Sequence, residues 1–101
     1  MSTVEVTMVR LYLTEGEHRL EALLRVLHDE ERVKGVTVFR GISGFGRSGR
    51  MHSSTLLDVS LDLPLVIEFF DEPARVETVL EHLAPQFEPG HIVMWPARVN
   101  V

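Results

Sequence analysis

The feature that most constrains the fold of this 101-residue chain is the order of its apolar patterns. Runs rich in β-branched, aromatic and other apolar residues predict strands at 4–13, 35–42, 63–70 and 91–101. Two stripes between these runs have the i, i+3, i+4, i+7 spacing of one helix face. The stripes are Leu20, Leu23, Leu24 and Leu27, and then Val76, Val79, Leu80 and Leu83. The predicted order of elements is therefore βαββαβ.

Short polar motifs predict where the two helices begin and end. Thr14 and Glu17 have the spacing of a capping box ahead of the first stripe, and Gly35 lies where a C-cap is expected. Before the second stripe, Asp71-Glu72-Pro73 supplies an acid for the N-cap and a proline for the first turn.

This order has a known solution, the ferredoxin-like α+β fold, with a four-stranded antiparallel sheet and two helices on one face. Right-handed crossovers place both helices on the same side of the sheet and leave the other side uncovered. Yet 63–70 is apolar on both faces, with Leu65 and Ile67 on one and Val66 and Phe70 on the other. A sheet with one wet face should alternate apolar and polar residues, so we expect self-association through the uncovered face.

Charge and composition exclude several classes of function. The net charge of −5 disfavours nucleic-acid binding, but 32–57 holds five basic residues and no acid, which favours a small anion or an acidic partner surface. A solvated loop is the alternative. Without cysteine, a signal-peptide pattern or a ~20-residue apolar run, the chain is expected to be a soluble cytoplasmic protein.

The segment 43–62 is expected to be a long loop, and it contains a G-x-G-x-x-G at Gly44, Gly46 and Gly49. No helical stripe follows the motif, as a dinucleotide-binding fold would require, and the P-loop lysine is absent. The five histidines form no H-x-H or H-x-x-x-H pair, and no nucleophile has a matching base, so neither a metal site nor an enzyme is expected.

The string from Gly35 to Ser54 resembles the second strand and the start of the T-loop of the PII signalling proteins. It is still more similar to a PII-like family of unknown function, domain family 190. The shared motifs, in chain order, are Arg40-Gly41, Gly44-Phe45-Gly46, His52-Ser53, Leu63-Pro64 and Asp71-Glu72-Pro73. The resemblance covers nearly the whole chain and implies a single PII-like domain over 1–101, with 43–62 as its T-loop.

The resemblance implies a homotrimeric, non-enzymatic regulator that binds an adenine nucleotide (ATP, ADP or AMP) in clefts between subunits. Its loop would signal to a protein partner such as a membrane channel or transporter. Gly46 and Arg47 would approach the phosphates, and Gly90, His91 and Arg98 would line the cleft from the neighbouring subunit. The full set of implied ligand-binding residues is Arg40, Gly44, Gly46, Arg47, Ser48, His52, Gly90, His91 and Arg98.

Several residues differ from those of the PII proteins, and these differences limit which ligands the resemblance implies. His91 stands where PII has a phosphate-binding lysine, and Ser48-Gly49 replace the glutamine and lysine tied to metal and 2-oxoglutarate. Tight Mg-ATP binding and 2-oxoglutarate sensing are therefore not expected, and a smaller or differently charged anion is the alternative ligand. No tyrosine lies between Phe39 and Phe70, which excludes uridylylation of a loop tyrosine.

Each implied residue also has a structural alternative. Arg47 could cap a turn or pair with an acid on a neighbouring subunit, Arg40 could form an inter-subunit salt bridge, and His52 could order the loop by hydrogen bonding to the backbone. Gly44 and Gly46 could serve only to permit positive φ in a turn. At the level of the whole protein, the alternatives are a ligand-free interaction module and an enzyme with a polar cavity between sheet and helices.

Overall fold

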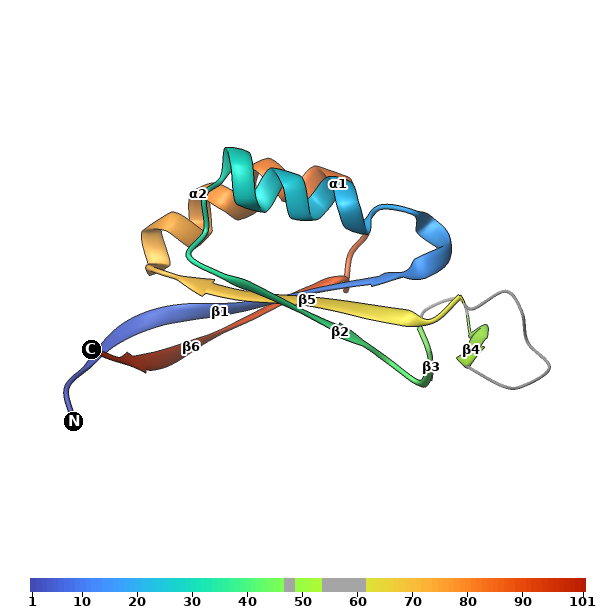
Figure 1. Cartoon of the computed structure of the whole chain (residues 1–101), viewed down its shortest axis with the longest axis horizontal. Helices are drawn as coiled ribbons and strands as arrows, with labels where there is room; N and C mark the ends of the chain where they lie inside the picture. Colours follow the sequence, from blue (N-terminus) through green and yellow to red (C-terminus); the bar gives the residue numbers. More distant parts are fainter. Residues whose placement is uncertain (47–48, 54–61) are drawn as a thin grey trace.

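A computed structural model describes residues 1–46, 49–53 and 62–101, and the side chains of all of these except His52 and Ser53. Four antiparallel strands form one sheet in the order β2-β5-β1-β6. They are β1 (Thr3–Thr14), β2 (Val36–Arg40), β5 (Pro64–Asp71) and β6 (Ile92–Asn100). The helices α1 (Leu20–Arg25) and α2 (Pro73–Leu83) cover one face of this sheet (Figure 1). The predicted ferredoxin-like α+β fold is thus confirmed.

The core forms because the alternation of β1 and β5 matches across their register. Val9 pairs with Phe69 and Leu11 with Ile67, and all four side chains are buried toward the helices. The predicted stripes meet them from above, through Leu23 and Leu27 and through Val76, Val79, Leu80 and Leu83. Apolar burial of this kind supplies most of the free energy that favours the fold.

The first helix differs from its prediction at both ends. The capping box of Thr14 and Glu17 is present, but it closes a short 3-10 turn, η1 (Glu15–Glu17), rather than α1. At the other end α1 runs into a π-helical turn, η2 (Val26–Glu30), and Arg32, with φ of 54°, takes the left-handed conformation expected of a C-cap. The predicted C-cap at Gly35 is therefore wrong. Arg75 of α2 supports this turn, because its guanidinium donates to the carbonyl oxygens of Glu31 and Arg32.

The second helix is preceded by two acids, and the second of them takes the N-cap position. Asp71 is the last residue of β5, buried, and its Oδ1 accepts a hydrogen bond from Glu72 N at 2.8 Å. Glu72 holds the N-cap position, and Pro73 lies in the first turn as predicted. A 3-10 turn, η3 (Ala84–Gln86), follows α2 and leads to the turn before β6.

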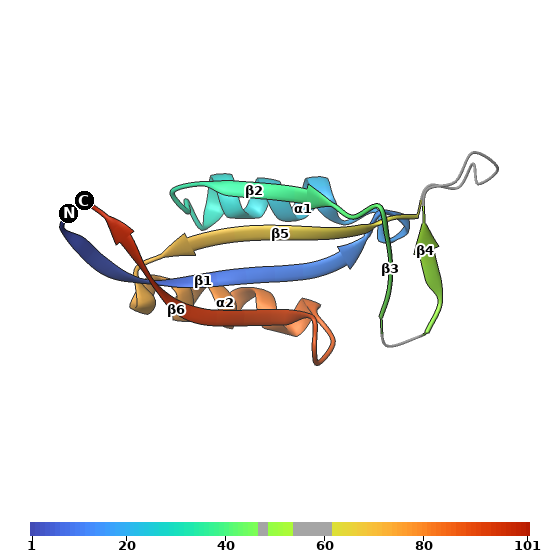
Figure 2. The same cartoon turned by 90° about the horizontal axis from the view of Figure 1, so that it is seen from below.

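The predicted loop at 43–62 contains a short hairpin. Strands β3 (Ser43–Phe45) and β4 (Met51–Ser53) pair with each other and stand beyond the end of the main sheet (Figure 2). Residues Leu57, Val59 and Leu61, which alternate in the sequence as in a strand, lie outside the described residues. The hairpin matters for function because β3 follows directly from the end of β2 and overhangs the sheet.

Among the described residues, no helix covers the second face of the sheet, which we call the open face (Figure 2). Phe39 and Trp95 on this face are 47% and 37% exposed. Between them lies a polar pair that sequence reasoning missed: Arg10 Nε is 2.6 Å from Glu68 Oε2. The Arg10 guanidinium carbon also lies 5.9 Å from the Phe39 ring centroid and 5.7 Å from that of Trp95. The apolar character expected of this face is present, with one ion pair at its centre.

Candidate ligand-binding site

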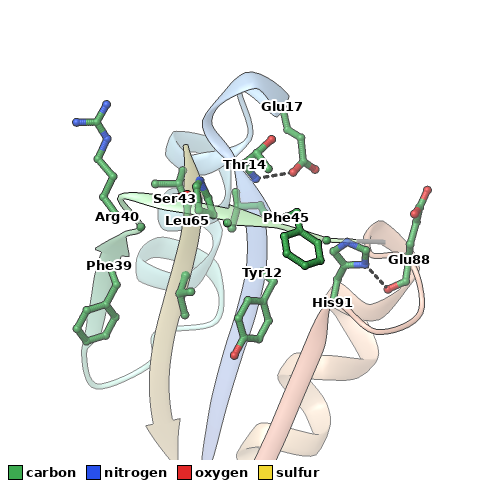
Figure 3. Close-up of a pocket in the computed structure, with 16 residues that line it drawn as sticks. Tyr12, Thr14, Glu17, Phe39, Arg40, Ser43, Phe45, Leu65, Glu88 and His91 are labelled. Carbon is green, nitrogen blue, oxygen red and sulfur yellow. Dashed lines mark hydrogen bonds between the residues drawn. The ribbon is translucent and has the colours of Figure 1, made fainter. Parts of the chain in front are cut away.

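A pocket of about 520 Å³ opens where the β3–β4 hairpin overhangs the end of the sheet. We call it the loop-base pocket. Phe45 of β3 and Tyr12 of β1 contribute aromatic rings, and Val66 of β5 adds an aliphatic wall. Figure 3 shows Phe45, Tyr12 and His91 around the middle of the pocket. Planar apolar groups with a few polar neighbours are typical of small-molecule sites.

The turn before β6 forms the opposite wall of the pocket. Gly90 has φ of 88°, a conformation that a side chain would strain, and it allows the chain to turn sharply into β6. His91 is fixed by its backbone, since its carbonyl oxygen accepts from Tyr12 N at 2.9 Å and its own N–H donates to Glu88 O at 3.2 Å. Its ring Nδ1 also lies 3.3 Å from Glu88 O. His91 is therefore held at the pocket by three hydrogen bonds.

Arg40, at the end of β2, is held in an ion pair. Its Nε and a terminal nitrogen lie 2.5 and 3.1 Å from the two carboxylate oxygens of Glu15. The bond from Arg40 is the main cause that lowers the pKa of Glu15, and the Leu63 N–H, 3.4 Å from Oε2, lowers it further. The same bond raises the pKa of Arg40. Although Arg40 lines the pocket, Figure 3 shows its guanidinium pointing away from Phe45 and His91.

Glu15 also ties the start of the loop to its end. Its backbone N–H donates to Leu63 O at 2.9 Å, so Glu15 contacts Leu63 through both backbone and side chain. Next to it, Gly16 N donates to Asp62 Oδ1 at 2.6 Å. We call this set of contacts among Glu15, Gly16, Arg40, Asp62 and Leu63 the loop clamp. It joins both ends of 43–62 to the turn that follows β1.

Gly41 brings the two strands at the loop base unusually close. Its N–H donates to Pro64 O at 2.7 Å, and a Cβ at this position would lie 2.7 Å from Pro64 Cγ. Both residues line the pocket. A glycine is needed here for close approach, whereas no described residue beyond its chain neighbours lies within 4 Å of a Cβ placed at Gly46.

The structure brings four of the nine predicted site residues together at the loop-base pocket: Arg40, Gly44, Gly46 and His91. Gly90 adjoins it. Arg98 lies near the far end of β6, paired with Glu5 of β1, so a single chain does not bring it to the pocket. The backbone of His52 pairs with Gly44 in the hairpin, and Arg47 and Ser48 lie outside the described residues.

One structural alternative for the glycines is wrong. Among the described glycines, positive φ occurs at Gly49 (76°) and Gly90 (88°), not at Gly44 or Gly46. Arg40 does form a salt bridge, but with Glu15 of its own chain.

Sequence reasoning missed several residues at this site: Tyr12, Glu15, Glu17, Asp62 and Glu88. Most of them carry no signal in a single sequence, because residues 15, 40 and 62 meet only in the folded chain. Tyr12 is the one residue of this set that the sequence could have indicated, because it is the chain's single tyrosine and lies in a predicted strand.

Two features are absent from the described residues. They contain no group of three or more His, Asp or Glu side chains arranged to hold a metal ion. In the same part of the chain, no helix is long and apolar enough to cross a membrane.

The fold is that of the PII-like proteins. The structure of CPII, a nitrogen regulatory PII-like protein from Thiomonas intermedia K12 bound to ADP, AMP and bicarbonate, aligns with a TM-score of 0.73 at 20% identity, covering 99% of this chain and all of CPII. CPII bound to ADP and bicarbonate aligns at 26% identity and a TM-score of 0.67, covering 99% of this chain and 91% of that one. A putative PII-like signalling protein from Thermus thermophilus gives a TM-score of 0.66 at 16% identity, over 98% and 91% of the two chains.

The chain belongs to domain family 190, described as "Uncharacterized ACR", whose profile matches residues 6–99. A UPF0166 protein of Aquifex aeolicus is 28% identical over 82% of this chain and 83% of its own length. A UPF0166 protein of Methanocaldococcus jannaschii is 29% identical over 79% and 77% of the two chains. The predicted family is thereby confirmed.

Proposed function

We propose that this protein is a PII-like regulator that binds an adenine nucleotide at the loop-base pocket and reports its presence through the 43–62 loop. The observation that carries the proposal is that the pocket and the base of the loop are built from the same residues. Arg40, Gly41 and Pro64 line the pocket, and they also begin and end the loop. A ligand that contacts this wall acts directly on both ends of the loop.

The chemistry of the pocket suits a nucleotide. Phe45 and Tyr12 offer aromatic faces for a base, and the open space at Gly46 lets a phosphate approach the backbone. CPII, which shares the fold, binds ADP and AMP.

The cleft is proposed to be completed by a second subunit. The guanidinium of Arg40 is already neutralised by Glu15, and Glu17 and Glu88 add negative charge to the wall. An anion therefore needs further cations, for which we propose Arg47 of the loop and Arg98 of a neighbouring copy, with Ser48 and His52 close to the ligand. A homotrimer joined through the open face would bury Phe39 and Trp95 and supply this arrangement.

The signal is proposed to pass to a protein partner in the cytoplasm, such as a membrane channel or transporter, without catalysis. An enzyme of this fold would need polar groups between sheet and helices. That space is filled by apolar side chains, and among the described residues Asp71 is the single buried polar one, bonded to its neighbour's backbone. A regulator is therefore favoured over an enzyme.

The test is a binding titration of the purified protein with ATP, ADP, AMP, phosphate and 2-oxoglutarate, with and without Mg²⁺, by calorimetry and thermal shift. A nucleotide at 100 times its Kd should stabilise the folded protein by about 2.7 kcal/mol. His91→Ala should lose most of the shift, while His28→Ala, an exposed histidine on η2, should keep it. Arg47→Ala and Arg25→Ala form a second matched pair. Absence of binding by every nucleotide would refute the proposal and favour the ligand-free module.

A further inference from the structure

A second hollow, of about 550 Å³, adjoins the loop-base pocket. The two share four lining residues: Thr14, Glu17, Glu88 and His91. The walls that they do not share differ in chemistry. The loop-base pocket has Phe45, Tyr12 and Val66, whereas the second hollow has Arg19 and Arg50. We call the second one the arginine hollow.

Arg19 is held in place at the arginine hollow. Its guanidinium carbon lies 4.6 Å from the centroid of the Phe87 ring, a stacking distance. One terminal nitrogen donates to Gln86 O at 2.6 Å, and the other to Glu17 Oε1 at 3.3 Å. Its side chain is 29% exposed. The cation is therefore positioned before any ligand arrives, which lowers the entropic cost of binding.

Arg19 keeps donors for a ligand. A guanidinium has five N–H donors, and the hydrogen bonds with other described residues use two of them. Glu17 is only partly available to pair with Arg19, because its Oε2 accepts a hydrogen bond from Thr14 N at 2.6 Å. Arg50, which precedes β4, faces the same hollow from the hairpin, and His91 lies at the boundary of the two spaces.

We infer that Arg19 and Arg50 bind the distal phosphate of a nucleotide whose base occupies the loop-base pocket, so that the site favours a nucleoside di- or triphosphate over a monophosphate. This inference rests on the proposed function. The loop-base pocket alone is within the size range of small-molecule sites. The adjoining hollow is the space that a chain of further phosphates would enter, past His91. Guanidinium groups match phosphate oxygens as bidentate donors, which a lysine cannot do.

The experiment compares the Kd of ADP and of AMP by calorimetry, for the full-length protein and for Arg19→Gln. We expect the unchanged protein to bind ADP more tightly than AMP. In Arg19→Gln, the Kd of ADP should rise about tenfold or more, as expected for the loss of a charged hydrogen bond, and the Kd of AMP should change less than about twofold. The matched control is Arg25→Gln, an exposed arginine at the end of α1, which should leave both constants unchanged.

Because Arg19 also packs on Phe87, a second variant protects the test against a folding defect. Arg50→Gln removes the other cation from the hairpin and should weaken ADP selectively as well. If both arginine variants weaken the binding of ADP and of AMP equally, or weaken the binding of neither, the inference is overturned while the proposal of nucleotide binding stands. If the unchanged protein binds no adenine nucleotide, the proposed function fails and the inference falls with it.

Discussion

Gly41→Ala tests whether β2 and β5 at the loop base lie too close together for any side chain. An alanine Cβ would lie 2.7 Å from Pro64 Cγ and 3.3 Å from Pro64 O. Real Cβ atoms do not come that close to carbon, and the neighbours have little room to yield, because Pro64 Cγ can move only by a change of ring pucker and Pro64 O is backbone. The Gly41 N–H bond to Pro64 O, 2.7 Å long, fixes the two strands at this separation.

The expected cost follows from this overlap. Forcing an extra methyl group into a filled site destabilises a protein by about 1–3 kcal/mol. In a domain of this size each kcal/mol lowers Tm by roughly 4–8 °C, so the variant should melt at least ~4 °C below the unchanged protein. Because Gly41 and Pro64 both line the loop-base pocket, nucleotide affinity should fall as well.

Gly35→Ala is the matched control for this measurement. No described residue beyond its chain neighbours lies within 4 Å of a Cβ at Gly35, and the φ of Gly35 is not positive, so the free energy of unfolding of this variant should change by less than ~0.5 kcal/mol. Both proteins are melted by differential scanning calorimetry at one protein concentration, since association shifts Tm. Equal Tm values for the two alanine variants would refute the reasoning from close approach.

Three further predictions concern the clamp, the core and the open face. The pKa of Glu15 is lowered in the folded state, so its contribution to stability is present above the ordinary glutamate pKa and is lost as pH falls through the folded-state pKa. Glu15→Gln should therefore reduce the loss of stability at acid pH and speed hydrogen exchange at the Leu63 amide. An unchanged exchange rate at Leu63 would argue against the loop clamp. Leu27→Ala empties a fully buried site and should cost about 2–5 kcal/mol in urea unfolding; a cost under about 1 kcal/mol would contradict its place in the core. Trp95→Lys should shift the proposed trimer to monomers in analytical ultracentrifugation, because a charge on the open face opposes burial of that face. An oligomer that this variant leaves unchanged would rule the open face out as the interface.

The sequence by itself determined the fold and the family. The order of the strands, the two helical stripes and the spacing of motifs such as Gly44-Phe45-Gly46 are local patterns, and local patterns can be read directly from the sequence. They also indicated the two-sided apolar sheet. They could not reveal the Arg10–Glu68 pair, since the two residues are 58 positions apart and meet only through the register of β1 with β5.

Only the tertiary structure decided what the candidate site is made of. Arg40 was expected at a ligand, yet the fold pairs it with Glu15, a residue with no distinguishing local context. Arg19 belongs to no motif of the sequence, and it is Phe87, 68 positions further along the chain, that stacks against it in the fold. The physical reason is the same in both cases. A charge acquires its role from the partners within a few ångströms of it, and those partners come from distant segments that only packing brings together.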